Sequence, residues 1–107
     1  MRQAGHLAAA GIHALENHVD RLAEDHANAE RLADGLREID ALEVTQATNM
    51  VFVSAPPSER KALAEHIESQ GLLIGGYNPS MRIVCHLDVD AGAVDLLVKT
   101  FASYPWP

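Results

Sequence analysis

Met50-Val51-Phe52-Val53 is an uninterrupted apolar run that is followed shortly by Pro56-Pro57. Four consecutive apolar residues that include β-branched and aromatic side chains are typical of a buried strand, and the prolines cannot continue it. We therefore predict a strand region over residues 43–54.

The residues that follow predict a helix and then a hairpin. Ser58 stands where the cap of a helix over residues 59–70 is expected, and Gly71 ends that helix. Residues 72–74 and 81–87 are short apolar runs, and the Gly-Gly-Tyr-Asn-Pro sequence between them is a dense turn signal. We expect these two runs to pair as a hairpin.

The C-terminal part of the chain predicts one more helix, over residues 91–103, capped by Asp88 or Asp90. The packing face of this helix consists of Val94, Leu97, Val98 and Phe101. The predicted order is thus helix, strand, helix, strand, strand, helix. It fits an α/β chain, more narrowly a small α+β domain over residues 1–107, whose mostly antiparallel sheet is covered by helices.

Residues 4–39 predict one long helix, because apolar residues recur at alternating steps of three and four. That stripe comprises Ile12, Leu15, Val19, Leu22, His26, Ala29, Ala33 and Leu36. A helix of that length spans about 54 Å, whereas a globule of this size has a radius of gyration of about 13 Å. We therefore expect the helix to extend beyond its own domain.

The first half of this predicted helix carries no charge between Arg2 and Glu16 and is rich in alanine and glycine. A helix that is apolar all round is normally buried. We therefore expect residues 3–15 to contact another chain or to be poorly ordered, as in a piece of a longer protein or an interlocked oligomer. A terminal arm in a swapped dimer is the alternative.

Composition narrows the classes of function. The 107 residues include 15 acidic and 8 basic ones, a formal net charge of −7, and the basic residues form no stripe. We therefore expect neither nucleic acid nor membrane as a partner. The single cysteine favours a reducing compartment, so we expect a cytoplasmic protein. No apolar run approaches the roughly 18 residues of a membrane span.

Three features suggest chemistry but have simpler interpretations. The histidines of the predicted helix lack the four-residue spacing of a helical zinc site, so we expect no metal site. Cys85 stands in an apolar strand whose next residue, His86, points to the opposite face, so we interpret it as a buried small hydrophobe. Gly75-Gly76 lacks the spacing of a phosphate-binding loop and is interpreted as a turn.

Arg82 is the strongest candidate for a binding residue. It shares one face of its predicted strand with Val84 and His86. A guanidinium in an apolar strand must meet an anion or lie at an edge, and its planar fork suits a carboxylate of a side chain or of a ligand. Both interpretations remain open on this pattern. Arg2, the only charge ahead of an apolar helix, raises the same question.

Five segments together resemble the C-terminal part of low-specificity L-threonine aldolases. They are Met1-Arg2-Gln3-Ala4-Gly5, Ala8 to Glu16, Arg21 to Asn28, Thr48 to Val53 and Arg82 to Val89. The segments follow one another in the order of that family and extend over nearly all of the chain. This match is more specific than any single motif.

The resemblance implies a lyase of amino acid metabolism with the aminotransferase-like fold, which uses pyridoxal phosphate to cleave threonine and allo-threonine to glycine and acetaldehyde. Such enzymes are usually homotetramers of longer chains. Residues 1–39 would connect a small domain, residues 43–107, to a large domain that lies outside this chain. By resemblance, Arg82 binds the α-carboxylate of the substrate, and Arg2 contributes to the cofactor-phosphate site.

The large domain of that family also carries the lysine that holds the cofactor. Lys61 and Lys99 are the only lysines here, and neither lies in a segment like that lysine segment. The resemblance therefore implies no catalytic residue and no bound cofactor in this chain alone. We expect its partner to be the large domain or a second copy of the chain. The alternative is a non-enzymatic oligomerisation module derived from the domain.

Overall fold

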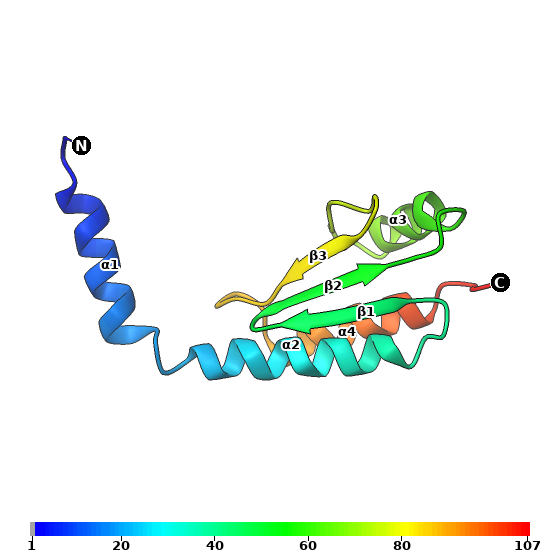
Figure 1. Ribbon diagram of the computed structural model, residues 1–107, viewed down its shortest axis with the longest axis horizontal. Helices are drawn as coiled ribbons and strands as arrows, with labels where there is room; N and C mark the ends of the chain where they lie inside the picture. Colours follow the sequence, from blue (N-terminus) through cyan, green and yellow to red (C-terminus); the bar gives the residue numbers. More distant parts are fainter. Residues whose placement is uncertain (1) are drawn as a thin grey trace.

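Four helices and three strands succeed one another in residues 2–107, the part of the chain that the computed structural model describes (Figure 1). They are α1 (Gly5–Asn17), α2 (Leu22–Arg37), β1 (Glu43–Ala47), β2 (Met50–Ser54), α3 (Arg60–Ser69), β3 (Met81–Val84) and α4 (Ala91–Ala102).

The three strands form one antiparallel sheet in the order β1-β2-β3. β1 and β2 are the arms of a hairpin in which Ala47 pairs with Met50. β3 pairs with β2 from Val53–Met81 at one end to Met50–Val84 at the other, and its second edge is unpaired. The predicted small antiparallel sheet and the α+β class are confirmed.

Two details of the predicted strands are wrong. Residues 43–54 turn back on themselves, because Thr48 takes a left-handed φ of 54° and reverses the chain. Residues 72–74 form no strand, so the hairpin expected between them and residues 81–87 does not exist. β3 pairs with β2 instead, along the edge of β2 that does not pair with β1.

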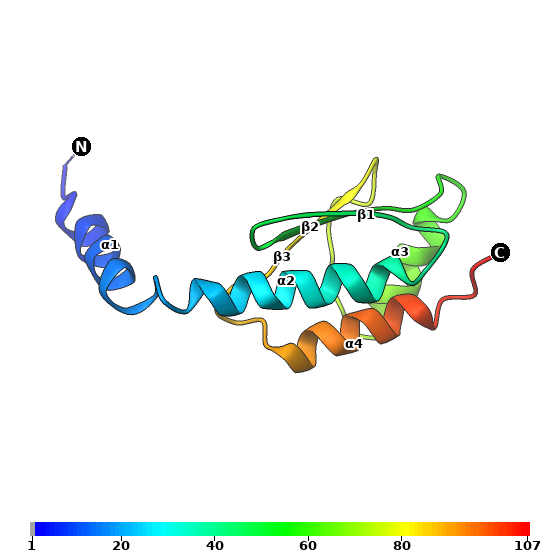
Figure 2. The ribbon, with the colours of Figure 1, turned by 60° about the horizontal axis from the view of Figure 1, so that its bottom comes forward.

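The core lies between the sheet and the pair α2 and α4, which run side by side beneath one face of it (Figure 2). Buried and half-buried residues alternate along β2, as a strand with one covered face requires. The largest fully buried side chains are Phe101, Leu32, Leu36, Leu63, Ile67, Met81, Val51, Val53 and Val94. α3 packs at the side, against α4.

The predicted helix over residues 4–39 is two helices, since α1 ends at Asn17 and α2 begins at Leu22. The Asn17 side chain donates a hydrogen bond to the backbone oxygen of His13 at 2.9 Å and so competes with the helical ladder. The three residues after Asn17 are poor helix formers. Of the predicted stripe, only the part in α2 reaches the core, through Ala29, Ala33 and Leu36.

The helix α1 projects from the domain as an arm (Figure 1). None of its residues is buried, and Leu7 and Leu15 expose 64% and 73% of their surface. The long axis of the molecule is 53 Å, and the radius of gyration of 16.4 Å exceeds the ~13 Å of a compact chain of this size. The expectation that residues 3–15 contact another chain stays a prediction.

The helix caps were predicted in part. Asp90 caps α4, because its side chain accepts a hydrogen bond from the N–H of Ala93 at 2.8 Å. Ser58 does not cap α3: its hydroxyl donates to the carboxylate of Glu59, which precedes the helix. Within residues 2–107 no helix is both long enough and apolar enough to cross a bilayer.

Candidate functional site

α2 and α4 lie beneath one face of the sheet (Figure 2), and because Met81 and Cys85 are buried on that face, Arg82 lies on the opposite one. It stands opposite Phe52 in the register of β2 and β3. Met81 and Cys85 are buried on the other face, whereas Arg82 and His86 are exposed. The predicted alternation of this strand is therefore confirmed, and the guanidinium is presented to solvent.

Arg82 also lacks a partner within the described residues. Four arginines in residues 2–107 make ion pairs or side-chain hydrogen bonds, whereas Arg2 and Arg82 make none there. The four pairs are Arg21 with Asp25, Arg31 with Asp95, Arg37 with Asp34 and Arg60 with Asn78. The interpretation of Arg82 as a structural ion-pair residue therefore finds no support in this part of the chain.

A hollow of about 330 Å³ opens beside the unpaired edge of β3, between this strand and residues 72–75. Arg82 and His86 are polar residues of its lining. Its apolar wall includes Leu32, Leu72, Ile74, Cys85, Val94 and Leu97. The apolar wall of this concavity suits the carbon skeleton of a small ligand.

The imidazole of His86 is fixed by the turn that follows β3. Its Nδ1 atom accepts a hydrogen bond from the backbone N–H of Asp88 at 3.2 Å, so in the neutral ring the proton resides on Nε2. The neutral ring therefore presents an N–H donor at its Nε2 atom. It does not activate Cys85, which lies on the opposite face.

Cys85 is fully buried. Burial raises the pKa of its thiol, and the nearby carboxylate of Asp25 raises it further. A thiol in this environment stays protonated and is a poor nucleophile. The interpretation of Cys85 as a buried small hydrophobe is confirmed.

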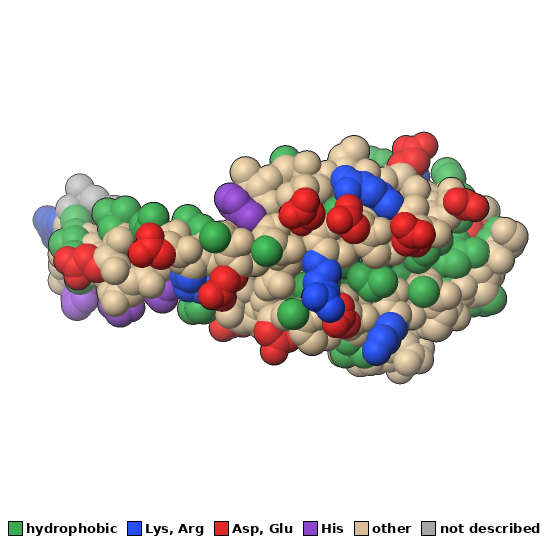
Figure 3. Space-filling model, turned by 90° about the horizontal axis from the view of Figure 1, so that it is seen from below, with side chains coloured by type: hydrophobic (Ala, Val, Ile, Leu, Met, Phe, Trp, Pro, Cys, Tyr) green, Lys and Arg blue, Asp and Glu red, His purple; other side chains and the backbone are tan. Residues whose placement is uncertain are grey.

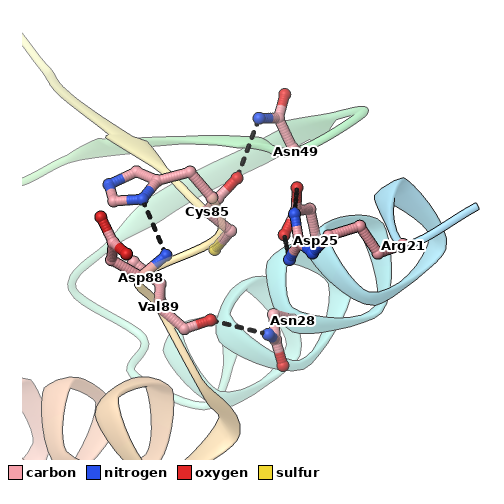
Figure 4. A network of polar contacts seen from close by, with 8 residues as sticks. Arg21, Asp25, Asn28, Asn49, Cys85, Asp88 and Val89 are labelled. Carbon is pink, nitrogen blue, oxygen red and sulfur yellow. Dashed lines mark hydrogen bonds and ion pairs between the residues drawn. The ribbon is translucent and has the colours of Figure 1, made fainter. Parts of the chain in front are cut away.

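A network of polar contacts fastens the segment that follows β3 to the rest of the domain (Figure 4). The Asn49 amide donates to the backbone oxygen of Cys85 at 2.9 Å, and the Asn28 amide donates to that of Val89 at 3.1 Å. Next to them, Asp25 is 3% exposed and is held by two hydrogen bonds from Arg21, of 2.7 and 3.2 Å.

The roles of Asn28 and Asn49 were not predicted from the sequence. Asn28 and Asn49 belong to segments that carry the family resemblance, but nothing in their local pattern shows that they bond to a strand far along the chain. The available signal was that asparagine is typical of tight turns, which places Asn49 in a loop rather than in a strand. Their partners depend on tertiary structure alone.

Arg2 lies at the outer end of the α1 arm, whereas Arg82 lies in the sheet (Figure 1). The structure therefore does not bring the two predicted site residues together within one chain. Arg2 is exposed. Its contact with a cofactor phosphate stays a prediction.

The described residues place no lysine beside Arg82. Lys61 is 91% exposed on α3, with its ammonium 3.9 Å from the carboxylate of Glu65, and Lys99 is exposed on α4. Neither lines the hollow next to β3. Within residues 2–107, no three metal-ligating side chains come together either.

Residues 1–56 match the family model of the beta-eliminating lyases, a family that depends on pyridoxal phosphate. The low-specificity L-threonine aldolase of Escherichia coli (strain K12) is 49% identical over 89 residues, which are 83% of this chain and 26% of that protein. Low-specificity L-threonine aldolase 1 of Arabidopsis thaliana is 34% identical over 108 residues, covering 94% of this chain and 30% of that protein.

The chain thus spans less than a third of the length of these curated relatives. The family model covers more than half of it, and low-specificity L-threonine aldolase 1 of Arabidopsis thaliana matches 94% of it. The chain therefore belongs to the beta-eliminating lyase family and is similar over most of its length to low-specificity L-threonine aldolases.

Proposed function

We propose that this chain supplies the small domain of a low-specificity L-threonine aldolase, in which Arg82 binds the α-carboxylate of threonine or allo-threonine. The guanidinium of Arg82, which is exposed and has no partner among residues 2–107, carries the proposal. The 49% identity to the Escherichia coli aldolase supports it.

The position of Arg82 suits this task. Two parallel N–H···O bonds from a guanidinium fix both the place and the plane of a carboxylate. Arg82 emerges from a strand rather than a loop, so its backbone is held by the pairing with β2. A substrate held in this way presents its reacting carbon in one orientation, which is the positional part of catalysis.

The cofactor belongs to the assembled enzyme rather than to this chain. Pyridoxal phosphate, when bound, acts as an electron sink for the substrate. Residues 2–107 do not fit that group by themselves, because Lys61 and Lys99 are exposed and neither lines the hollow beside β3. In our proposal a large domain supplies the lysine, and Arg2 contributes a contact to the cofactor phosphate at a subunit boundary.

Mixing the chain with a large-domain fragment of the Escherichia coli aldolase tests this function. We expect the mixture to develop the absorbance of bound pyridoxal phosphate and to release acetaldehyde from threonine. Neither component should do so alone. The Arg82→Ala chain should restore the absorbance but little cleavage, which separates assembly from substrate binding. A mixture that stays inactive and colourless contradicts the proposal.

The exposed apolar surface of α1 (Figure 3) favours a second candidate, a non-enzymatic module that associates with its own copies. Leu7, Ile12 and Leu15 each expose more than half of their surface on this arm. Under this alternative the isolated chain forms a stable oligomer in sedimentation velocity while the mixture shows no activity. A monomeric chain that complements the large domain decides against it.

A further inference from the structure

The direction in which Arg82 points depends on the register of a very short strand. β3 has four residues and lies at the edge of the sheet, where β2 is its one partner strand within residues 2–107. Met81 and Cys85 face the helices, and Arg82 faces away from them. Because side chains alternate, a slip of β3 by one residue would turn Arg82 toward the core.

Asn49 extends the pairing of this strand by one step. The regular ladder ends at Met50 and Val84. Beyond it, the backbone oxygen of Asn49 accepts the N–H of Cys85 at 2.8 Å, and the Asn49 side-chain amide donates to the backbone oxygen of the same residue at 2.9 Å. Asn49 therefore binds both the backbone N–H and the backbone oxygen of Cys85. Its side-chain amide donates the bond that a backbone N–H donates in a regular strand pair.

The turn that carries Asn49 is strained. Thr48, a β-branched residue, has a φ of 54°, a conformation that such residues rarely adopt. Its backbone oxygen accepts a hydrogen bond from the Gln46 amide at 2.8 Å, and its hydroxyl donates to the backbone oxygen of Ala47 at 2.7 Å. Strain of this kind persists where the surrounding structure requires one backbone path. Here that path places Asn49 against the end of β3.

The far end of the same segment is held independently. The Asn28 side chain of α2 donates a hydrogen bond to the backbone oxygen of Val89, and the backbone N–H of Asp88 donates one to Nδ1 of His86 (Figure 4). The chain between β3 and α4 is thus fastened at both ends, by Asn49 at the strand side and by Asn28 at the helix side.

We propose that Asn49 is a positioning residue, which holds β3 in the register that presents Arg82 and His86 on the open face of the sheet. The register part concerns this chain alone. The consequence for catalysis rests on the proposed role of Arg82 in binding the substrate carboxylate. Asn49 itself contacts neither substrate nor cofactor in this proposal.

Substituting Asn49 in the intact chain tests the register by NMR. Asn49→Asp keeps the size of the side chain but replaces the amide donor by a carboxylate facing the Cys85 oxygen, and Asn49→Ala removes the group without adding charge. Both variants keep the backbone oxygen of Asn49 that accepts the Cys85 N–H, but they lose the side-chain bond that holds this end of β3. We therefore expect hydrogen exchange at the Cys85 backbone N–H to accelerate about tenfold. We also expect the cross-strand proton contact between Phe52 and Arg82 to weaken or to appear twice.

Asn17→Asp is the matched control, because Asn17 donates a similar bond, of 2.9 Å, on the exposed arm. It should leave the β3 signals unchanged. A purely structural role for Asn49 would lower the melting temperature while native-state contacts between Phe52 and Arg82 stay intact and single. That result would overturn the proposal, as would unchanged exchange at Cys85.

The second arm of the experiment uses the mixture with the large-domain fragment. We expect Asn49→Ala to raise the KM for threonine several-fold with a smaller change in kcat, in the same direction as Arg82→Ala. An altered register with an unaltered KM would overturn the positioning role. If the wild-type mixture is inactive, the proposed function fails while the NMR arm still decides whether Asn49 sets the register.

Discussion

Gly35 of α2 lies so close to Val98 of α4 that a Cβ atom on Gly35 would sit 2.8 Å from both methyl carbons of the valine. The two helices therefore touch at this point with no side chain of α2 between them. This close crossing keeps both helices against the same face of the sheet, where Leu32 and Leu36 reach the core.

Gly35→Ala should therefore destabilise the domain. Overpacking of a tight contact costs about 1–3 kcal/mol, which exceeds the gain of about 1 kcal/mol that alanine brings to a helix. Urea unfolding followed by circular dichroism measures the difference. Gly11→Ala is the control, because a Cβ at Gly11 meets nothing within 4 Å, and it should not lower stability.

The double variant Gly35→Ala with Val98→Ala checks the cause. Removing the two methyl groups of Val98 relieves the clash, so the two changes should be less harmful together than the sum of their separate effects. Additive effects would show that the loss comes from somewhere other than this contact.

The sequence was sufficient for the elements whose signal is local. The apolar face of α4, its cap at Asp88 or Asp90 and the limits of α3 were predicted, because capping groups, periodicity and a terminal glycine depend on neighbours along the chain; the structure selects Asp90. The break between α1 and α2 was missed, because the three-and-four spacing of apolar residues continues across the turn that Asn17 begins.

The strand pairing was missed for a different reason. The turn at Thr48 contains no glycine, and a β-branched residue with positive φ has no sequence signal, whereas the glycines at 75 and 76 suggested a hairpin that is absent. The same limit applies to the site. The alternation that exposes Arg82 follows from the strand alone, but the contacts of Asn28 and Asn49 join segments distant in sequence.

Arg82→Ala should change the stability of the isolated chain by no more than about 0.5 kcal/mol. Arg82 has no ion-pair or hydrogen-bond partner in residues 2–107, so removing its guanidinium leaves no buried polar group without a partner. Arg21→Ala should by contrast lower the unfolding midpoint clearly, since it removes both hydrogen bonds to Asp25, which is 3% exposed. Thermal unfolding compares the two variants.

In the assembled enzyme the same Arg82 variants should have large effects. Arg82→Lys keeps the charge but loses the two-point contact, so threonine cleavage should weaken. Arg82→Ala should cost about 2–5 kcal/mol in kcat/KM if the carboxylate pair is desolvated. A marked loss of thermal stability in the isolated Arg82→Ala chain would instead identify a structural ion pair and remove the physical support for carboxylate binding.

Cys85 should make the domain sensitive to alkaline pH. Burial raises the pKa of this thiol in the native state above its ordinary value of 9.0. Above pH 9.0 the thiol of the unfolded chain loses its proton while the native thiol keeps it, so the unfolded state binds fewer protons and stability falls as pH rises through the native pKa. Cys85→Val should flatten this part of the profile of unfolding midpoint against pH. An equal alkaline loss in the variant would assign the effect to other groups.

The arm α1 should be covered in the functional assembly. Its residues are all exposed in the single chain, and its sequence carries no charge between Arg2 and Glu16 that would favour solvation. Ile12→Glu places a carboxylate on this surface, and burying that charge without a partner is costly, so association should weaken. Sedimentation velocity of the chain alone and with the large-domain fragment measures the loss.

Ala62→Glu supplies the matched control for the arm, because Ala62 is exposed on α3 and the variant carries the same added charge. If association depended only on net charge, which is already −7, both variants would weaken it equally. A selective effect of Ile12→Glu places the contact on α1. A wild-type chain that remains monomeric in both experiments, with NMR signals of an ordered and solvated α1, would contradict the prediction, because the apolar arm would then be stable without any cover.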